Sequence, residues 1–152
     1  MTLREHLALI DSCIVRAALL AGLPHLFFKG GADMGMMSRW TWHLHESPEN
    51  VTAAVEVLVS LDEANEGVEI KVYSEFYERG NRAEEGSSRM YYGRYVRFDD
   101  LVPQTEDIVS GLQEKLRHAW QELPNLVSSI PRLKEERRVF MEGLKRSGLL
   151  QD

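Results

Sequence analysis

The sequence predicts an α+β protein in which helices pack against an antiparallel sheet. Between Ser38 and Asp99, residues that favour strands alternate with period two and are separated by turn clusters. The flanking segments repeat apolar residues with a spacing near that of a helix. We therefore expect an N-terminal helix, a four-stranded antiparallel meander and two C-terminal helices packed on one face of the sheet.

Length and composition indicate one ordinary globular domain. The chain has 152 residues, 43% hydrophobic and 28% charged, which favours a single α+β domain over residues 1–152. Its net charge of -6 makes nucleic-acid binding an unfavoured function. No uncharged apolar run reaches the ~18 residues of a membrane span, so we expect no membrane association. The lone Cys13 excludes an intrachain disulfide and is compatible with a cytoplasmic location.

The first helix is predicted over residues 2–21. Thr2 and Glu5 have the spacing of a capping box, and Gly22 followed by Pro24 ends the helix. Its apolar stripe is wider than one face, which is typical of a central core helix or an oligomer interface. Residues 29–37, rich in glycine and methionine, are predicted as a connecting loop, because their spacing matches no phosphate-binding motif.

Four strands are predicted, at residues 38–46, 52–61, 68–77 and 89–98. Alternation assigns one side of each strand to the core. The predicted inward residues are Trp40, Trp42, Leu44, Ala53, Val55, Val57, Val59, Leu61, Val68, Ile70, Val72, Phe76, Met90, Tyr92, Val96 and Phe98.

Two helices follow the predicted sheet. The first begins after Thr105 and carries an apolar stripe that continues to Pro124. The second begins near Pro131, and its stripe of Leu133, Phe140 and Leu144 is expected to pack inward. Its basic residues then belong to the solvated side.

His43 and His45 are the sharpest candidates for chemistry. Two residues apart on a strand, they project to the same face, and Glu56 on the neighbouring strand has matching parity. Such a group is able to hold a divalent ion, but this motif alone is common and a structural metal site needs about four ligands. We therefore expect no metal and no other cofactor.

The outward positions of the third and fourth strands are rich in aromatic and titratable residues. Lys71, Tyr73, Glu75 and Tyr77 share one side of the third strand. The fourth strand contributes Tyr91, Tyr95 and Arg97. This surface is open to three interpretations: a solvated face, a protein-binding face and a small-ligand groove. The residues expected to bind are His43, His45, Glu56, Tyr73 and Arg97.

Charge is segregated along the chain. Residues 46–69 contain seven acidic and no basic residues, whereas residues 132–146 contain six basic and three acidic ones. Opposite patches of this kind are able to pair between subunits or to attract a charged partner.

The first functional hypothesis is a non-enzymatic intracellular binding protein, such as an adaptor, an inhibitor or a chaperone-like protein. It would act through the polar aromatic sheet face or the acidic segment, with another protein as partner and a homo-oligomer as a further option. The second hypothesis is a small-ligand or metal-dependent enzyme centred on His43, His45 and Glu56. Nucleic-acid binding through Arg89, Arg94 and Arg97 is the third. No serine lies in a nucleophile elbow.

Overall fold

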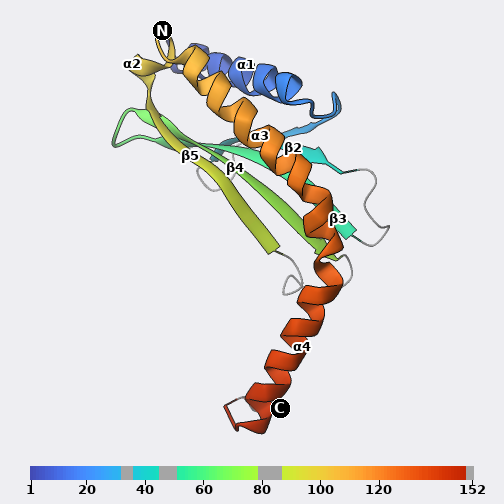
Figure 1. The fold of residues 1–152 in the computed structure, drawn as a ribbon. Coiled ribbons are helices and arrows are strands. Elements are labelled where there is room, and N and C mark those ends of the chain that lie inside the picture. Colours follow the sequence, from blue (N-terminus) through green and yellow to red (C-terminus); the bar gives the residue numbers. More distant parts are fainter. Residues whose placement is uncertain (32–35, 45–50, 79–86, 150–152) are drawn as a thin grey trace.

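The computed structural model describes residues 1–31, 36–44, 51–78 and 87–149 (Figure 1). His45, the turn predicted at residues 46–50, most of the hairpin tip predicted at residues 79–88, and Met34 lie outside these ranges. The elements in chain order are α1 (Leu3–Ala21), β1 (Phe28–Gly30), β2 (Met36–His43), β3 (Val51–Asp62), β4 (Gly67–Glu78), β5 (Ser87–Arg97), α2 (Phe98–Leu101), α3 (Thr105–Ser128) and α4 (Ile130–Arg146). The predicted α+β class is confirmed.

The strands form an antiparallel meander in the order β1-β2-β3-β4-β5. The predicted strand number of four is wrong by one, because Phe28–Gly30 forms an edge strand opposite Thr41, Trp40 and Arg39. Three residues are too few to show an alternation, so this strand is recognisable only from its pairing with β2.

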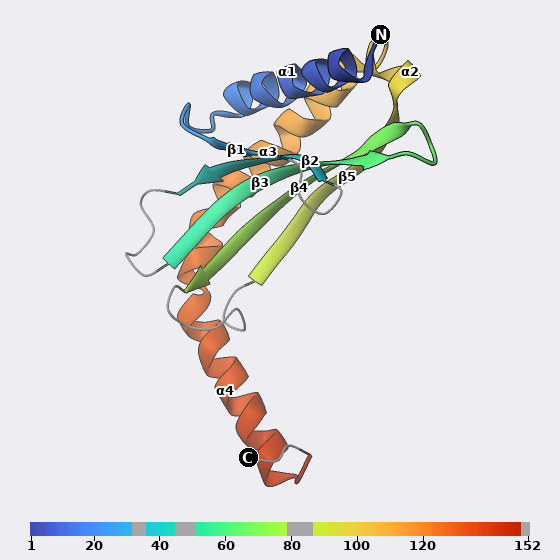
Figure 2. The same ribbon diagram turned by 180° about the vertical axis from the view of Figure 1, so that it is seen from behind.

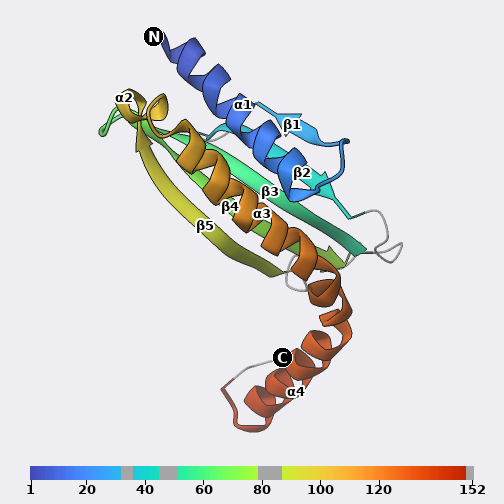
Figure 3. The same ribbon diagram turned by 45° about the horizontal axis from the view of Figure 1, so that its top comes forward.

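Two helices cover one face of the sheet, which we call the inner face. α1 and α3 lie side by side across it (Figures 1 and 3). The Arg16 guanidinium joins the helices through two hydrogen bonds of 2.8 and 2.7 Å to the Glu106 carboxylate. The core between helices and sheet includes Ile10, Ile14, Trp42, Val57, Ile70, Leu112 and Leu116, all buried.

Local signals at the ends of α1 act as the sequence predicts. The Thr2 hydroxyl accepts a hydrogen bond from the Glu5 backbone, and the Glu5 carboxylate accepts one from the Thr2 backbone. At the other end Gly22 has φ of 82°, a left-handed conformation that glycine adopts without steric cost. The chain then returns to the sheet at β1.

A β-bulge in β5 changes which side chains face the helices. Val72 lies opposite Tyr92 but Tyr73 lies opposite Met90, so Tyr91 is an extra residue on β5. Two predictions are therefore wrong. Met90 is 60% exposed on the far side of the sheet, and Tyr91 turns inward to α3.

The prediction that α4 packs inward is also wrong. α4 continues beyond the ends of the strands, away from the sheet (Figures 1 and 2). Ile130 is its one buried residue, while Phe140 is 64% exposed. The reason is geometric: Ser129 keeps right-handed helical angles, so α4 follows on from α3 past the sheet edge. Lys134 anchors its first turns through a 2.7 Å ion pair with Glu78 at the end of β4.

We expect Val57→Ala and Leu112→Ala each to lower the free energy of unfolding by about 2–4 kcal/mol, because each leaves a cavity in the core. Urea denaturation measures both changes. Val139→Ala, on the exposed α4, is the control and should stay within about 0.5 kcal/mol of the wild type. Equal stability of all three variants would show that the inner face is not the core.

The bulge gives a second test, based on two tyrosines of the same strand. Tyr91→Phe removes a part-buried hydrogen bond to Glu122 and should cost about 1 kcal/mol of folding free energy. Tyr95→Phe alters an exposed side chain and should cost less than about 0.5 kcal/mol. The reverse order in denaturant titrations would contradict the position of the bulge.

Candidate functional site

The face of the sheet opposite α1 and α3, which we call the outer face, carries the candidate site. Seen from behind in Figure 2, no helix of the described ranges crosses it. Strand register places Thr41, Glu56, Tyr73 and Met90 in one cross-strand row. Residues of such a row project from the same side of the sheet and lie next to one another.

Glu56 is the unusual member of this row. It is only 5% exposed although it belongs to an uncovered face. One carboxylate oxygen, Oε1, accepts a 3.4 Å hydrogen bond from the Thr41 hydroxyl, and the other, Oε2, has no hydrogen-bond partner in the described structure. Its neighbours on the same side of β3, Ala54 and Leu58, are buried as well. The outer side of the central strand is therefore buried at all three positions.

The electrostatic surroundings of Glu56 favour its neutral form. Burial raises the pKa of this carboxyl above its ordinary value, and the negative charge of Glu75 raises it further. The Arg39 charge and the Thr41 hydrogen bond act in the opposite direction but are weaker. The pKa of Tyr73 is also raised, first by burial and then by Glu56. Two acidic groups, Glu56 and Glu75, and two basic groups, Arg39 and Lys71, therefore act on this part of the outer face.

The structure brings only some of the predicted site residues together. Glu56 and Tyr73 are cross-strand partners, and His43 lies on the same side of β2, two residues from Thr41. The His43 ring makes an edge contact with the Phe28 ring at 5.5 Å between centroids. Among the described residues, no three His, Cys, Asp or Glu side chains are placed to hold a metal ion. His45 lies outside those residues.

Arg97 lies at the other end of the outer face. It pairs with Gly67, six positions along β4 from Tyr73, which corresponds to ~20 Å. Its guanidinium lies 4.0 Å from the Glu66 carboxylate, and both side chains are exposed. Arg97 is therefore not part of the group around Glu56.

A second polar cluster, which sequence analysis missed, joins β5 to α3. The Glu122 carboxylate accepts hydrogen bonds from Arg89 and from the Tyr91 hydroxyl, the latter at 2.9 Å. His118, one helical turn earlier, lies 3.4 Å from the same carboxylate. The helical spacing of His118 and Glu122 is visible in the sequence, but the bulge that turns Tyr91 toward them is not. A carboxylate on the helix with two hydrogen bonds from β5 suits a clamp that holds the strand to the helix.

Comparisons with protein families, with curated proteins and with solved structures found no match to this chain. The helices described here include none with the length and hydropathy needed to cross a membrane. The geometry and charge of the outer face are therefore the basis for assigning a function.

The substitution Glu56→Gln tests whether the pKa of the Glu56 carboxyl is raised in the folded protein. Because the folded-state pKa is raised, the folded protein binds more protons than the unfolded chain between the ordinary and the raised pKa. The wild-type free energy of unfolding should fall as pH rises through that window, and the variant should lack this fall. Above that window we expect the variant to be the more stable protein, because it removes the cost of ionising a buried carboxyl.

Urea denaturation between pH 4 and 8 measures this difference, with Glu106→Gln as the control. Arg16 lowers the pKa of Glu106, so its neutralisation should reduce stability at pH 7 and have little effect at acid pH. Parallel stability curves for wild type and Glu56→Gln would contradict the raised pKa.

Proposed function

We propose that this protein is a non-enzymatic binding protein whose outer sheet face holds a segment of another protein. A basic side chain of that segment, arginine or lysine, would contact Glu56. The observation that carries this proposal is the buried Glu56 carboxylate, which retains an oxygen without a hydrogen-bond partner on an otherwise open face. We also propose a cytoplasmic location, since the only cysteine, Cys13, is a buried free thiol.

An incoming cation would supply what Glu56 lacks. A buried acceptor without a partner costs about 1–3 kcal/mol, and native proteins keep few such groups. A guanidinium or ammonium group would donate to the free oxygen and offset the charge of Glu56 and Glu75. Binding would then convert a group that destabilises the free protein into a hydrogen-bonded ion pair.

The side chains around Glu56 suit contact with a protein segment. Tyr73 is half-buried beside it, and Met90 is exposed in the same row. Phe28, 64% exposed, lies opposite Thr41 on the edge strand. Aromatic and methionine side chains are enriched in protein interfaces, where a few of them carry most of the binding energy.

The surroundings of His43 favour binding over acid–base chemistry. Its ring contacts Phe28, whereas the hydrogen bond of Glu56 is with Thr41. General acid–base catalysis needs a donor and an acceptor within reach of the same reacting atom, and a hydrophobic contact supplies neither. The buried Glu56 carboxyl also disfavours a nucleic acid, whose phosphates need cations.

Selection of random peptides displayed on phage, with the full-length protein as bait, tests the proposal. We expect the enriched peptides to contain arginine or lysine beside apolar residues. In calorimetric titrations of the best peptide, Glu56→Gln should weaken binding by at least ~10-fold, and Tyr73→Ala by a comparable factor.

Glu106→Gln is the matched control, because it makes the same change on the helical side of the molecule. It should leave the peptide affinity within about twofold of the wild type. Selected peptides without cationic residues, or an affinity unchanged by Glu56→Gln, would refute the proposal.

A further inference from the structure

α4 carries an apolar stripe that nothing in the described structure covers. Leu133, Phe140 and Leu144 recur at helical spacing, and Met141 widens the stripe. Phe140 is the most exposed of the four, and Leu133 and Met141 are exposed as well. Arg137 occupies the centre of this stripe, between Leu133 and Phe140, and has no ion pair within the described residues.

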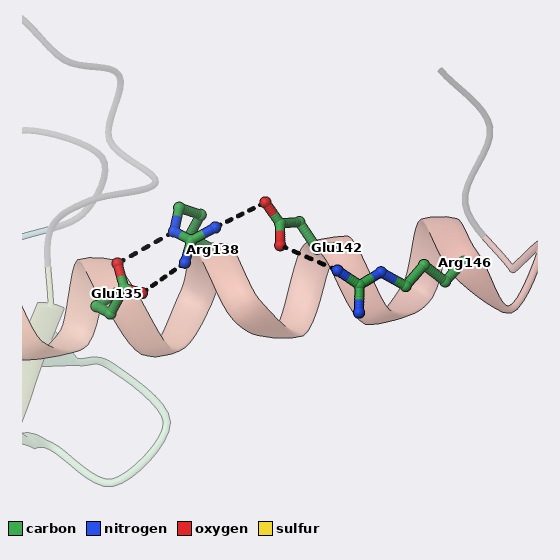
Figure 4. A network of polar contacts seen from close by, with 4 residues as sticks. All are labelled: Glu135, Arg138, Glu142 and Arg146. Carbon is green, nitrogen blue, oxygen red and sulfur yellow. Dashed lines mark hydrogen bonds and ion pairs between the residues drawn. The ribbon is translucent and has the colours of Figure 1, made fainter.

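The opposite side of α4 is occupied by its own ion pairs (Figure 4). Arg138 binds Glu135 at 2.6 Å and Glu142 at 2.7 Å, and Arg146 lies 3.8 Å from Glu142. These pairs are spaced three and four residues apart, so they stabilise the helix without any tertiary contact. The polar side of α4 is thus satisfied by itself, while the stripe and Arg137 are not.

The outer face and the stripe of α4 are complementary in charge and in apolar surface. Among the described residues, the Glu56 Oε2 has no hydrogen-bond donor and Arg137 has no ion-pair partner. Phe28 and Met90 expose apolar surface on the sheet, and Phe140 does so on the helix. Within one chain the two surfaces are apart, because α4 runs beyond the strand ends while Lys134 is held at Glu78 (Figures 1 and 2).

We propose that α4 of a second copy of this chain packs across the outer face, with its Arg137 guanidinium against the Glu56 carboxylate. The exchange is reciprocal, so that a two-fold dimer contains this contact twice. The 17 residues of α4 span about 26 Å, within the about 40 Å of the twelve-residue strands β3 and β4. This inference rests on the proposed function: the second copy occupies the binding face until a partner competes for it.

The arrangement of charge favours a protein surface over a membrane as the occupant. A helix that lies in a membrane interface keeps its basic residues at the border of the apolar side. Here Arg137 lies in the middle of that side, where it would enter the acyl region without a partner. A protein surface that offers a buried carboxylate accommodates both the stripe and its central charge.

Sedimentation velocity of the full-length protein over a concentration series tests the dimer. We expect the wild type to dimerise, and Arg137→Glu to weaken dimerisation by at least ~10-fold. Arg132→Glu makes the same change on α4 away from the stripe and should stay within about twofold of the wild type. A wild type that stays monomeric at about 100 μM would overturn the proposal, because a dimer that is dissociated at this concentration is too weak to occupy the outer face. An equal effect of the two substitutions would also overturn it.

A double-mutant cycle identifies the pair of residues. If Glu56 and Arg137 contact each other, Glu56→Gln and Arg137→Gln each weaken the dimer, and the double variant is no weaker than the weaker single variant. Additive losses would overturn the contact. The choice of occupant would be overturned if the protein stays monomeric and instead binds vesicles of phosphatidylcholine and phosphatidylserine in a way that depends on Arg137.

The peptides selected on phage separate this inference from the proposed function. Arg137→Glu should bind them as tightly as the wild type or more tightly, because it frees the outer face, whereas Glu56→Gln loses them. Peptide binding through Glu56 in a protein that remains monomeric refutes the dimer alone. A dimer that depends on Glu56 and Arg137, in a protein that selects no cationic peptide, refutes the proposed function.

Discussion

The packing of α1 and α3 on a single face of the sheet is the constraint on which the rest of the molecule depends. The two helices bury the inward side chains of every long strand, so the core forms between these two layers. None of the described helices crosses the outer face, where Glu56 is nonetheless only 5% exposed. Its carboxyl is therefore desolvated without belonging to the core between the two layers. A helix on this face would have required an apolar residue at that position.

The same constraint determines the position of α4. α3 has 24 residues, which correspond to about 36 Å, close to the length of the strands it crosses. A helix that continues in the same direction therefore leaves the sheet. Its apolar stripe has the same spacing as the stripe of α3, yet one is buried and the other is exposed. Amphipathic spacing predicts that one side of a helix will be buried. Whether that side packs on the sheet of its own chain depends on the length of the sheet.

Much of the fold was predictable, because it depends on local periodicity. The alternation around Trp42, Val57 and Ile70, and the capping box at Thr2, act within short segments and were assigned from sequence. Features that depend on pairing were not. β1 is too short to show a pattern, and the bulge at Tyr91 reverses the side of Met90 without a signal in composition. In the candidate site, the side of Glu56 and Tyr73 was predictable from parity. The burial of Glu56 was not, since alternation assigns a residue to one side of the sheet and does not show how far that side is covered.

Glu56 and Arg137 share one physical property: neither has an ion-pair partner among the described residues. Glu56 belongs to the acidic segment 46–69, and Arg137 belongs to the basic segment 132–146. The segregation of charge along the sequence therefore places two groups of opposite charge on different elements of the fold. An exposed ion pair contributes little, because water already solvates both ions. Glu56 is different, since most of its desolvation cost is already present in the free protein and does not have to be met again on binding. A cation that reaches it gains more than it would from an exposed carboxylate, and this advantage holds for a basic side chain of a partner and for Arg137 of a second copy. The outer face should therefore bind more tightly the cation whose neighbouring side chains make the better apolar contacts with it.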